Sequence, residues 1–328
     1  MKKLDVLCVG ALLGDYSAKV ERHPGPDDEV FVPRLELFAG GSAANTSVGL
    51  ARLGVTAGFM GKVGEKDALG AFLREDLVAE GVNVDGLVLD PTLHTGLVFV
   101  AVDATGDRRM YAHSGAANEF LPRDVAWPLV ESSKLAYLSS LRRLDAFVAV
   151  ARRRRKLGLP VVANPGMLGV DRPWDELEPL VKSVDVLALS RAEAAAVARN
   201  LPVKRADPEK VARALLEVGG PAHVVVTTGA SGCLVASSGG TRADVLKVES
   251  FEVPVVDATG AGDAFMAGFL ATLVEFVAPD GKMSVGTEQL SACCRTGAAV
   301  AALAIQKAGA RNGLPVRADL EAFLRERG

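Results

Sequence analysis

Short apolar runs alternate with longer amphipathic runs along most of the chain. The apolar runs predict strands, and they cover residues 5–9, 56–63, 135–138, 160–163, 184–189 and 223–227. The amphipathic runs predict helices between these strands, at residues 43–53, 68–80, 145–157, 191–199 and 208–218. This alternation predicts a mainly parallel sheet with helices on both faces, a three-layer α/β/α fold.

Two segments, about 16–38 and 95–113, interrupt the alternation because each contains consecutive strand-like runs. The turn 103–107, Asp-Ala-Thr-Gly-Asp, is typical of a hairpin. We expect both segments to meet as a small antiparallel sheet, a lid inserted in one domain that spans residues 1–328. Since exposed edge strands invite pairing with a second copy, a lid-mediated homodimer is a further hypothesis.

The composition is that of a globular protein, with 328 residues, 49% hydrophobic and 23% charged residues, and a net charge of −3. Such a charge gives no reason to expect nucleic acid or an anionic membrane as partner. The most apolar stretch outside the N-terminus, 297–305, has about half the length that a membrane span needs. All four cysteines lie in apolar stretches, which predicts buried, reduced thiols and a cytoplasmic location.

A basic run at residues 152–156 ends one predicted helix. Consecutive residues point all around a helix, and cations suit its C-terminus. We therefore interpret the run as a solvated helix end, with a phosphate-binding patch as the alternative.

The sharpest chemical feature is the glycine-rich segment 257–265, with the sequence DATGAGDAF. We expect a strand at 253–256 before it and a helix at 264–275 after it. Glycines at a helix start let backbone N–H groups converge on an anion, and Asp263 beside that anion suits a base that accepts a proton from a hydroxyl. The alternatives are a tight turn capped by Asp263, or a dinucleotide fingerprint, which lacks its third glycine because Phe265 stands there.

A second glycine cluster, 39–45 with the sequence AGGSAAN, opens the helix predicted at 43–53. Asn45 offers both a hydrogen-bond donor and an acceptor one turn into that helix, which suits a ligand rich in hydroxyl groups. The alternative is an asparagine bonded to local backbone.

Together, segments 39–54 and 257–263 resemble the N-terminal and C-terminal signatures of ribokinase-like (PfkB-type) carbohydrate kinases. The resemblance implies a ribokinase-like fold and transfer of the γ-phosphate of ATP to a hydroxyl of a sugar or sugar derivative. It implies that Asp263 is the catalytic base and that Gly260, Ala261 and Gly262 form the anion hole. The substrate pocket would then contain Asp15, Gly41, Asn45 and Asn118.

The same resemblance implies a nucleotide side to the site. It assigns ATP binding to Asn164, Thr227, Gly229 and Gly232. Glu193 would hold Mg²⁺ through water, although Ser190 stands where the family usually has asparagine. Asp257 and Thr259 match positions that bind K⁺ in several members, whereas Gly313 replaces a late polar residue of that site.

Two alternatives to a sugar kinase remain open. A nucleoside kinase of the adenosine, guanosine or cytidine type is favoured by residues 115–118, which resemble adenosine-type members, and by Phe31, Phe38 and Phe99 in or near the lid. A non-catalytic sugar-binding relative is the alternative from another class, and the intact Asp263 argues against it.

Overall fold

A nine-stranded sheet forms the body of the protein, in a computed structural model that describes residues 3–203, 206–238 and 243–327. Its neighbouring strands pair in parallel, except that β12 and β13 are antiparallel to their neighbours. The strand order is β13 (Asp244–Val248), β12 (Cys233–Ser237), β11 (His223–Thr227), β10 (Val186–Ser190), β9 (Val161–Asn164), β8 (Leu135–Ser139), β1 (Val6–Gly10), β4 (Ala57–Gly64) and β5 (Asn83–Asp90).

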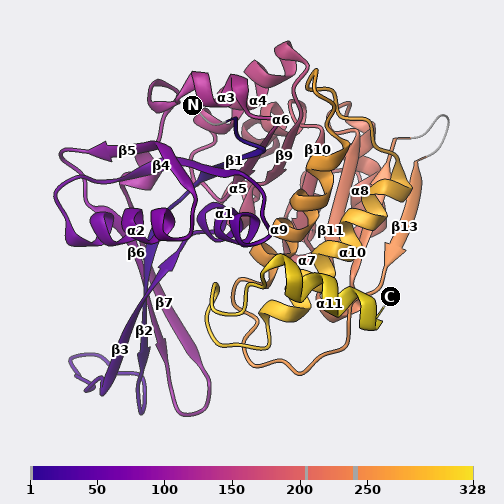
Figure 1. The fold of residues 1–328 in the computed structure, drawn as a ribbon. Helices are drawn as coiled ribbons and strands as arrows, with labels where there is room; N and C mark the ends of the chain where they lie inside the picture. The colour runs from indigo at the N-terminus through magenta and orange to yellow at the C-terminus, as the bar shows by residue number, and fades with distance from the viewer. Residues whose placement is uncertain (1–2, 204–205, 239–242, 328) are drawn as a thin grey trace.

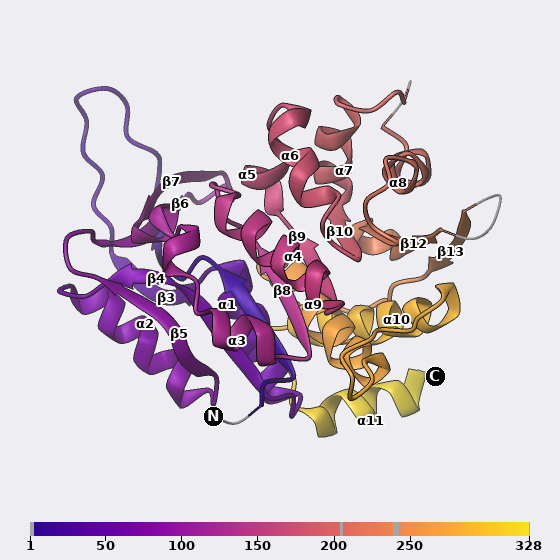
Figure 2. The same cartoon turned by 90° about the horizontal axis from the view of Figure 1, so that it is seen from above.

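Helices cover both faces of this sheet, which confirms the three-layer fold (Figures 1 and 2). In β1, Val6 and Cys8 join one buried apolar cluster while Leu7 and Val9 join the other, because successive side chains of a strand point to opposite faces. The first cluster includes side chains of α1 (Ser42–Arg52), α2 (Ala68–Ala79), α9 (Ala261–Leu273), α10 (Thr287–Ala304) and α11 (Arg317–Arg327). The second includes side chains of α3 (Trp127–Ser132), α4 (Asp145–Leu157), α5 (Gly166–Val170), α6 (Trp174–Val181), α7 (Arg191–Ala198) and α8 (Pro208–Glu217).

A separate four-stranded sheet forms the lid and projects from the body (Figure 1). Its order is β3 (Arg34–Gly40), β2 (Leu13–Lys19), β6 (Thr95–Val102) and β7 (Arg108–Gly115). The lid strands of the first segment extend beyond both predicted limits of 16–38, whereas those of the second begin at the predicted residue 95 and end two residues after the predicted 113. The sheet is also mixed rather than antiparallel, because the central strands β2 and β6 run in parallel.

The strand predicted at 253–256 is absent, which corrects the sequence analysis. Val255 and Val256 are 63% and 64% exposed, and the Val256 N–H donates to Ile305 O at the end of α10. Pro254 interrupts the stretch and lacks the N–H that a sheet would use. The glycine-rich turn therefore follows an extended segment outside the sheet.

The basic run at 152–156 is not wholly solvated, because Arg154 in α4 is fully buried. Its guanidinium donates to the carbonyl oxygens of Val130, Ser133, Lys134 and Pro160. Arg154 thus binds the end of α3 to the starts of β8 and β9, which corrects the interpretation of the run as a simple helix end.

The four cysteines are buried and form no disulfide, as expected. Burial raises the pKa of Cys293 to about 12, so this thiol stays protonated. Among the described residues, no helix combines the length and hydropathy that crossing a membrane requires.

Candidate active site

Several predicted site residues lie at the carboxyl ends of parallel strands. The strand register pairs Gly10 with Ser139, Ser139 with Asn164, and Ser190 with Thr227. Parallel strands end at one edge of their sheet, and ligands of open α/β folds bind at that edge. Asn164 and Thr227 therefore share the edge where β1 leads into the lid.

Asp263 and Asn45 meet where α9 packs against α1. The Asn45 side-chain amide Nδ2 donates to Asp263 Oδ2 at 2.8 Å, although the two residues are 218 positions apart. Thr46 Oγ1 donates to the Asp263 carbonyl at 3.3 Å. One turn further along each helix, a Cβ on Gly49 would lie 2.6 Å from the Ala267 Cβ, so glycine permits this close approach.

Asp15 lies in β2, where the lid joins the body, and its carboxylate lies against the start of α1. A Cβ on Gly40 would lie 2.1 Å from Asp15 Oδ2, and a Cβ on Gly41 would lie 2.2 Å from the Ala11 carbonyl oxygen. Gly41 also has a φ of 101°, which favours glycine. Gly40 therefore lets the backbone pass directly beside Asp15, and Gly41 lets it pass beside Ala11.

The protonation of these two carboxyl groups is tuned by burial. Burial raises the pKa of Asp263 to about 6, while hydrogen bonds from Asn45 and Ser42 and the charge of Arg311 lower it, and the Asp15 charge raises it. Burial likewise raises the pKa of Asp15 to about 6, against the charge of Arg311. Asp263 thus has the proton affinity of a base that works near neutral pH.

The glycine turn 260–262 opens α9. Gly260 precedes the helix with a φ of 76°, and a Cβ there would lie 2.8 Å from the Ala310 Cα. The N–H of Ala261 already donates to the Ala258 carbonyl at 3.2 Å. The N–H of Gly262 has no acceptor within the described ranges, so it is an unpaired donor of the first helical turn.

A cavity of about 830 Å³ joins this turn to the predicted nucleotide residues. Thr227, Gly229 and Gly232 line it on one side, and Ala261 and Gly262 on the other. Its remaining walls include apolar side chains that the sequence analysis did not identify, namely Phe251, Val253, Val255, Phe265, Ala298, Ala301 and Ile305. An apolar cavity next to a helix start suits a ligand that joins a ring system to phosphates.

Asn164 and Glu193 contact each other at the strand ends. Asn164 Nδ2 donates to Glu193 Oε2 at 3.2 Å and to the Ala188 carbonyl at 2.9 Å. Ser190 caps α7, because its Oγ accepts from the Glu193 N–H at 3.2 Å while its own N–H donates to Glu193 Oε2 at 2.8 Å. Glu193 Oε1 has no donor within the described residues, so it suits a water bound to Mg²⁺.

Asp257 connects the glycine turn to the segment after α10. Its Oδ1 accepts from the Thr259 N–H at 2.9 Å and its Oδ2 from the Gly309 N–H at 2.8 Å. Burial raises the pKa of Asp257, but these hydrogen bonds lower it by more, so the pKa lies below its ordinary value and Asp257 is ionised. An ionised carboxylate with remaining lone pairs fits a monovalent cation.

Asn118 lies in a short 3₁₀ helix, η1 (Ala116–Glu119), directly after the lid strand β7. Its Nδ2 donates to Glu119 Oε1 at 3.3 Å, whereas its Oδ1 is buried and has no partner in the part of the chain that the structure describes. A buried acceptor of this kind is suited to a donor on a ligand.

Arg311 is a site residue that the sequence analysis missed. It follows α10, is 8% exposed, and its Nε donates to Asn45 Oδ1 at 2.7 Å. Its NH1 forms an ion pair with Asp76 in α2. Its only sequence signal is that it is a charged residue among the small residues of segment 308–313, where the family resemblance implied only a cation ligand.

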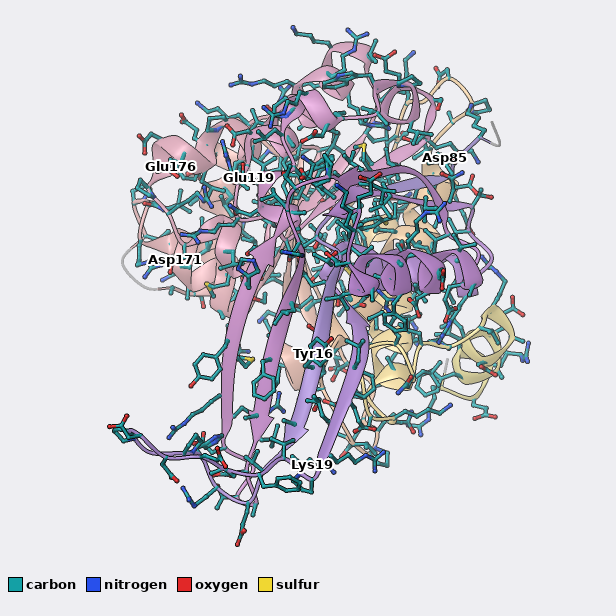
Figure 3. All side chains as sticks on the ribbon, turned by 90° about the vertical axis from the view of Figure 1, so that its left-hand side faces the viewer. Tyr16, Lys19, Asp85, Glu119, Asp171 and Glu176 are labelled. Atoms are coloured by element: carbon teal, nitrogen blue, oxygen red, sulfur yellow. The ribbon has the colours of Figure 1, made fainter. Side chains whose placement is uncertain are left out.

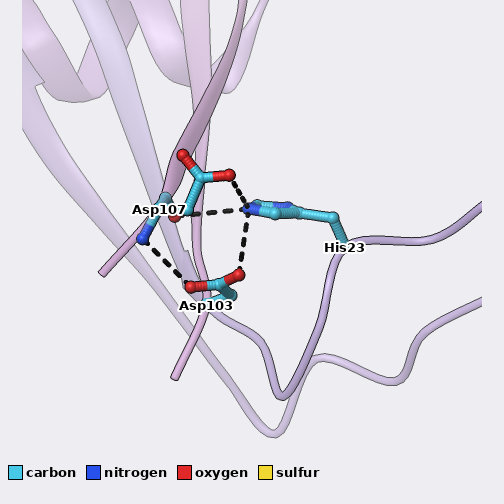
Figure 4. Close-up of side chains that lie close together, drawn as sticks. All are labelled: His23, Asp103 and Asp107. Carbon is cyan, nitrogen blue, oxygen red and sulfur yellow. Dashed lines mark hydrogen bonds and ion pairs between the residues drawn. The ribbon is translucent and has the colours of Figure 1, made fainter. Parts of the chain in front are cut away.

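A second cluster of polar side chains lies at the far end of the lid, beyond the labelled Tyr16 and Lys19 (Figures 3 and 4). His23 Nε2 lies 3.2 Å from the Asp107 carbonyl oxygen, and 3.8 and 3.9 Å from the carboxylates of Asp103 and Asp107. The cluster holds the loop after β2 against the β6–β7 turn, so His23 belongs to the lid framework rather than to the strand-end site.

Known proteins match this chain over nearly its whole length. Residues 3–317 match the pfkB family carbohydrate kinase description. An ATP-dependent ribose-1-phosphate kinase of Halopiger xanaduensis is 30% identical over 98% of both chains. A nucleoside kinase of Methanothermobacter thermautotrophicus is 27% identical over 95% of this chain and 92% of its own. The structure of Arabidopsis thaliana ribokinase complexed with ribose and ATP has a TM-score of 0.84 and 26% identity, covering 98% of this chain and 99% of that chain.

The fold is therefore ribokinase-like, with the lid sheet described above. The chain belongs to the pfkB family of carbohydrate kinases, which confirms the resemblance found in the sequence. Its chemistry is that of an ATP-using phosphotransferase with a hydroxyl group as acceptor, and its relatives act on sugars or nucleosides.

Proposed function

We propose that this protein phosphorylates a hydroxyl of a sugar or sugar derivative with Asp263 as the base. The observation that carries the proposal is the position of Asp263, in the first turn of α9 and hydrogen-bonded to Asn45. Asp15 supplies a second carboxylate to the same pocket. Two carboxylates and one amide can bind neighbouring hydroxyls and still leave an oxygen to accept a proton.

The transfer would follow an in-line path from the cavity to the carboxylate pair. ATP would lie in the 830 Å³ cavity, with Thr227, Gly229 and Gly232 beside it and Asn164 near the phosphates. The helix start at residues 260–262 would stabilise charge on the transferring group, with the Gly262 N–H as the available donor. Asp263 takes the proton as the substrate oxygen attacks, and Gly41, Asn45 and Asn118 hold the substrate.

Two cations would support the reaction. Glu193 would hold Mg²⁺ through water, and this ion neutralises phosphate charge when bound. Asp257 and Thr259 would contribute oxygens to a K⁺ site that fixes the glycine turn. The lack of a side chain at Gly313 leaves the remaining ligands to backbone oxygens.

A nucleoside is the second candidate substrate, supported by the inner face of the lid. The strand register places Phe38, Val98 and Ala112 on the same face as Asp15. These apolar side chains would cover a base if the ribose hydroxyls were bound by Asp15 and Asn45.

The opposite face of the lid supports the proposed homodimer. Leu37, Tyr16, Phe99 and Tyr111 are register partners across all four strands, and Tyr111 is 66% exposed. An apolar face with exposed Leu37 and Tyr111 beside the half-buried Tyr16 and Phe99, on a sheet with open edges, fits a second copy of this chain. The four buried free thiols support a location in the reducing cytoplasm.

The decisive experiment measures ADP release with Mg·ATP across sugars, sugar phosphates, sugar acids and nucleosides, in K⁺ and in Na⁺ buffers. Asp263→Asn should lower kcat by about 10²- to 10⁴-fold and leave KM nearly unchanged, since Asn keeps the shape but accepts no proton. Asp85→Asn, an exposed aspartate in β5, is the matched control and should keep full turnover. Unchanged kcat in Asp263→Asn would refute the base assignment.

A further inference from the structure

We propose that Arg311 is a positioning residue for the phosphoryl transfer: its hydrogen bond to Asn45 Oδ1 orients the Asn45 amide toward Asp263, and its charge acts on the site carboxylates. The inference rests on the proposed function, because it takes Asp263 as the base. Arg311 itself touches neither Asp263 nor Asp15 through any hydrogen bond found in the described residues.

Three helices and the segment after α10 contribute to one series of polar contacts, which is buried at its centre. Asp76 of α2 pairs with Arg311 after α10, Arg311 donates to Asn45 of α1 at 2.7 Å, and Asn45 donates to Asp263 of α9 at 2.8 Å. Arg311 is 8% exposed and Asn45 is 4% exposed, so water competes little for these contacts. The position of Asp263 thus depends on a residue two contacts away.

The chemistry of arginine determines which group donates and which accepts in these hydrogen bonds. A guanidinium only donates hydrogen bonds, so the Asn45 oxygen must face Arg311. The Asn45 NH₂ group must then face Asp263. Because this group only donates hydrogen bonds, it needs an acceptor there, and an ionised carboxylate is one. A glutamine or asparagine in place of Arg311 could turn either end toward Asn45 and would not impose this orientation.

The charge of Arg311 has a second effect, on the two carboxylates. Asp15 of β2 and Asp263 act on each other as like charges, while Arg311 favours the ionised form of both. Tyr137 of β8 also faces Asp263, and burial raises its pKa well above the ordinary value, so it stays neutral. Arg311 is therefore the cation that offsets two negative charges in the pocket.

Acidic groups on the far side of Arg311 moderate its charge. Asp76 forms the ion pair, and its side chain is 29% exposed. Glu80, which pairs with Arg52, also acts on Arg311. Removing the Asp76 charge should therefore make Arg311 act more strongly on Asp263, the opposite of removing Arg311 itself.

The test is the pH profile of kcat and of kcat/KM for three variants of the 328-residue chain. In Arg311→Gln we expect the acid limb to move up by about one pH unit, which lowers kcat about twofold at pH 7 and about tenfold at pH 5, in addition to a fall at every pH because the Asn45 orientation is lost. In Asp76→Asn we expect the limb to move down by about half a unit. Arg311→Lys keeps the charge but loses the directed Nε contact, so its limb should stay in place while kcat falls at every pH.

Several outcomes would overturn the proposal. Acid limbs that move in the same direction in Arg311→Gln and Asp76→Asn, or that do not move, would indicate a merely structural role. A rise in KM with kcat unchanged would make Arg311 a substrate contact instead. If Arg311→Gln does not fold, Arg311→Lys and Asp76→Asn still decide the matter. Full turnover in Asp263→Asn would refute the proposed base, whereas an inactive Asp263→Asn with unmoved acid limbs would refute only the role of Arg311.

Discussion

The carboxylate of Asp263, the proposed base, must be ionised to accept a proton. It lies where water solvates it poorly. Its pKa of about 6 in the folded protein exceeds the ordinary value of 3.8. Between these two values the folded state binds more protons than the unfolded state, so stability falls as pH rises through this window. The proposed base therefore costs the protein stability at neutral pH, and the nearby Asp15 acts in the same direction.

Replacing this charge should stabilise the fold while it removes activity. We expect Asp263→Asn to unfold at a higher temperature than the wild type at pH 8, because a neutral amide keeps the acceptor for Asn45 without the buried charge. At pH 4 the wild-type carboxyl is protonated, so the difference should largely disappear. Thermal unfolding followed by circular dichroism at both pH values checks this, and an equal difference at both would contradict it. Asp15→Asn should behave in the same way.

Sequence alone could identify the residues whose chemistry is written in local motifs. Asp263 and Asn45 lie in glycine-rich helix starts that indicate anion and hydroxyl binding. Arg311 could not be assigned, because its role depends on Asn45 and Asp76, which are 266 and 235 positions away. The burial of Arg154 could not be predicted either, because it depends on carbonyl groups at the end of α3 and directly before β8 and β9.

At the scale of elements, the contact between α1 and α9 determines the geometry of the site. Asn45 and Asp263 form one contact of this interface, and Gly49 and Ala267 form the next, one turn away on each helix. Neither α1 nor α9 has a side-chain cap at its start, so the glycines Gly41 and Gly260 and the helix packing define both starts.

Adding a methyl group at this interface should separate the helices. We expect Gly49→Ala to destabilise the protein by about 1–3 kcal/mol and to lower kcat about tenfold or more, because its Cβ would lie 2.6 Å from that of Ala267. The double variant with Gly49→Ala and Ala267→Gly moves the methyl group to the other helix and should restore both properties. Urea unfolding and turnover measure the effect, and a double variant as impaired as the single one would contradict this account.

Most elements could be predicted because their patterns are strong. The expected strand at 223–227 matches β11, and the others agree with β1, β4, β8, β9 and β10 to within about two residues at each end. The missed strands β5, β12 and β13 lie at the two edges of the sheet or next to them. Edge strands are buried less completely, and β5 also contains aspartate and glycine, so its pattern is weak.

At the scale of the whole molecule, the two faces of the lid have different tasks. The face that carries Asp15 is the one proposed to cover the substrate, whereas the opposite face exposes Leu35 and Tyr111, at 53% and 66%. The existence of a lid followed from the sequence, since two segments broke the alternation. Its mixed order did not, because a parallel β2–β6 pair joins strands from segments distant in sequence.

The outer lid face yields a prediction about assembly. If it joins two copies, Leu35→Glu combined with Tyr111→Glu should convert a dimer into a monomer, because two buried charges would oppose association. Leu246→Glu in β13, where the leucine is 39% exposed, is the matched control and should leave the mass unchanged. Light scattering at micromolar concentration measures the mass, and a monomeric wild type would refute the dimer.

The contact between α1 and α9 also has a consequence for the order of synthesis. The chain makes α1 and its buried Val48 and Leu50 early, but α9 and Arg311 emerge only with the last fifth of the sequence. At ribosomal speeds of roughly 5–20 residues per second, the first helix waits on the order of ten seconds or more for its partner. If Asp263 is the base, a growing chain should not transfer phosphate. The segment that covers the apolar core on this side also carries the proposed base, so completion of the core and onset of activity should coincide.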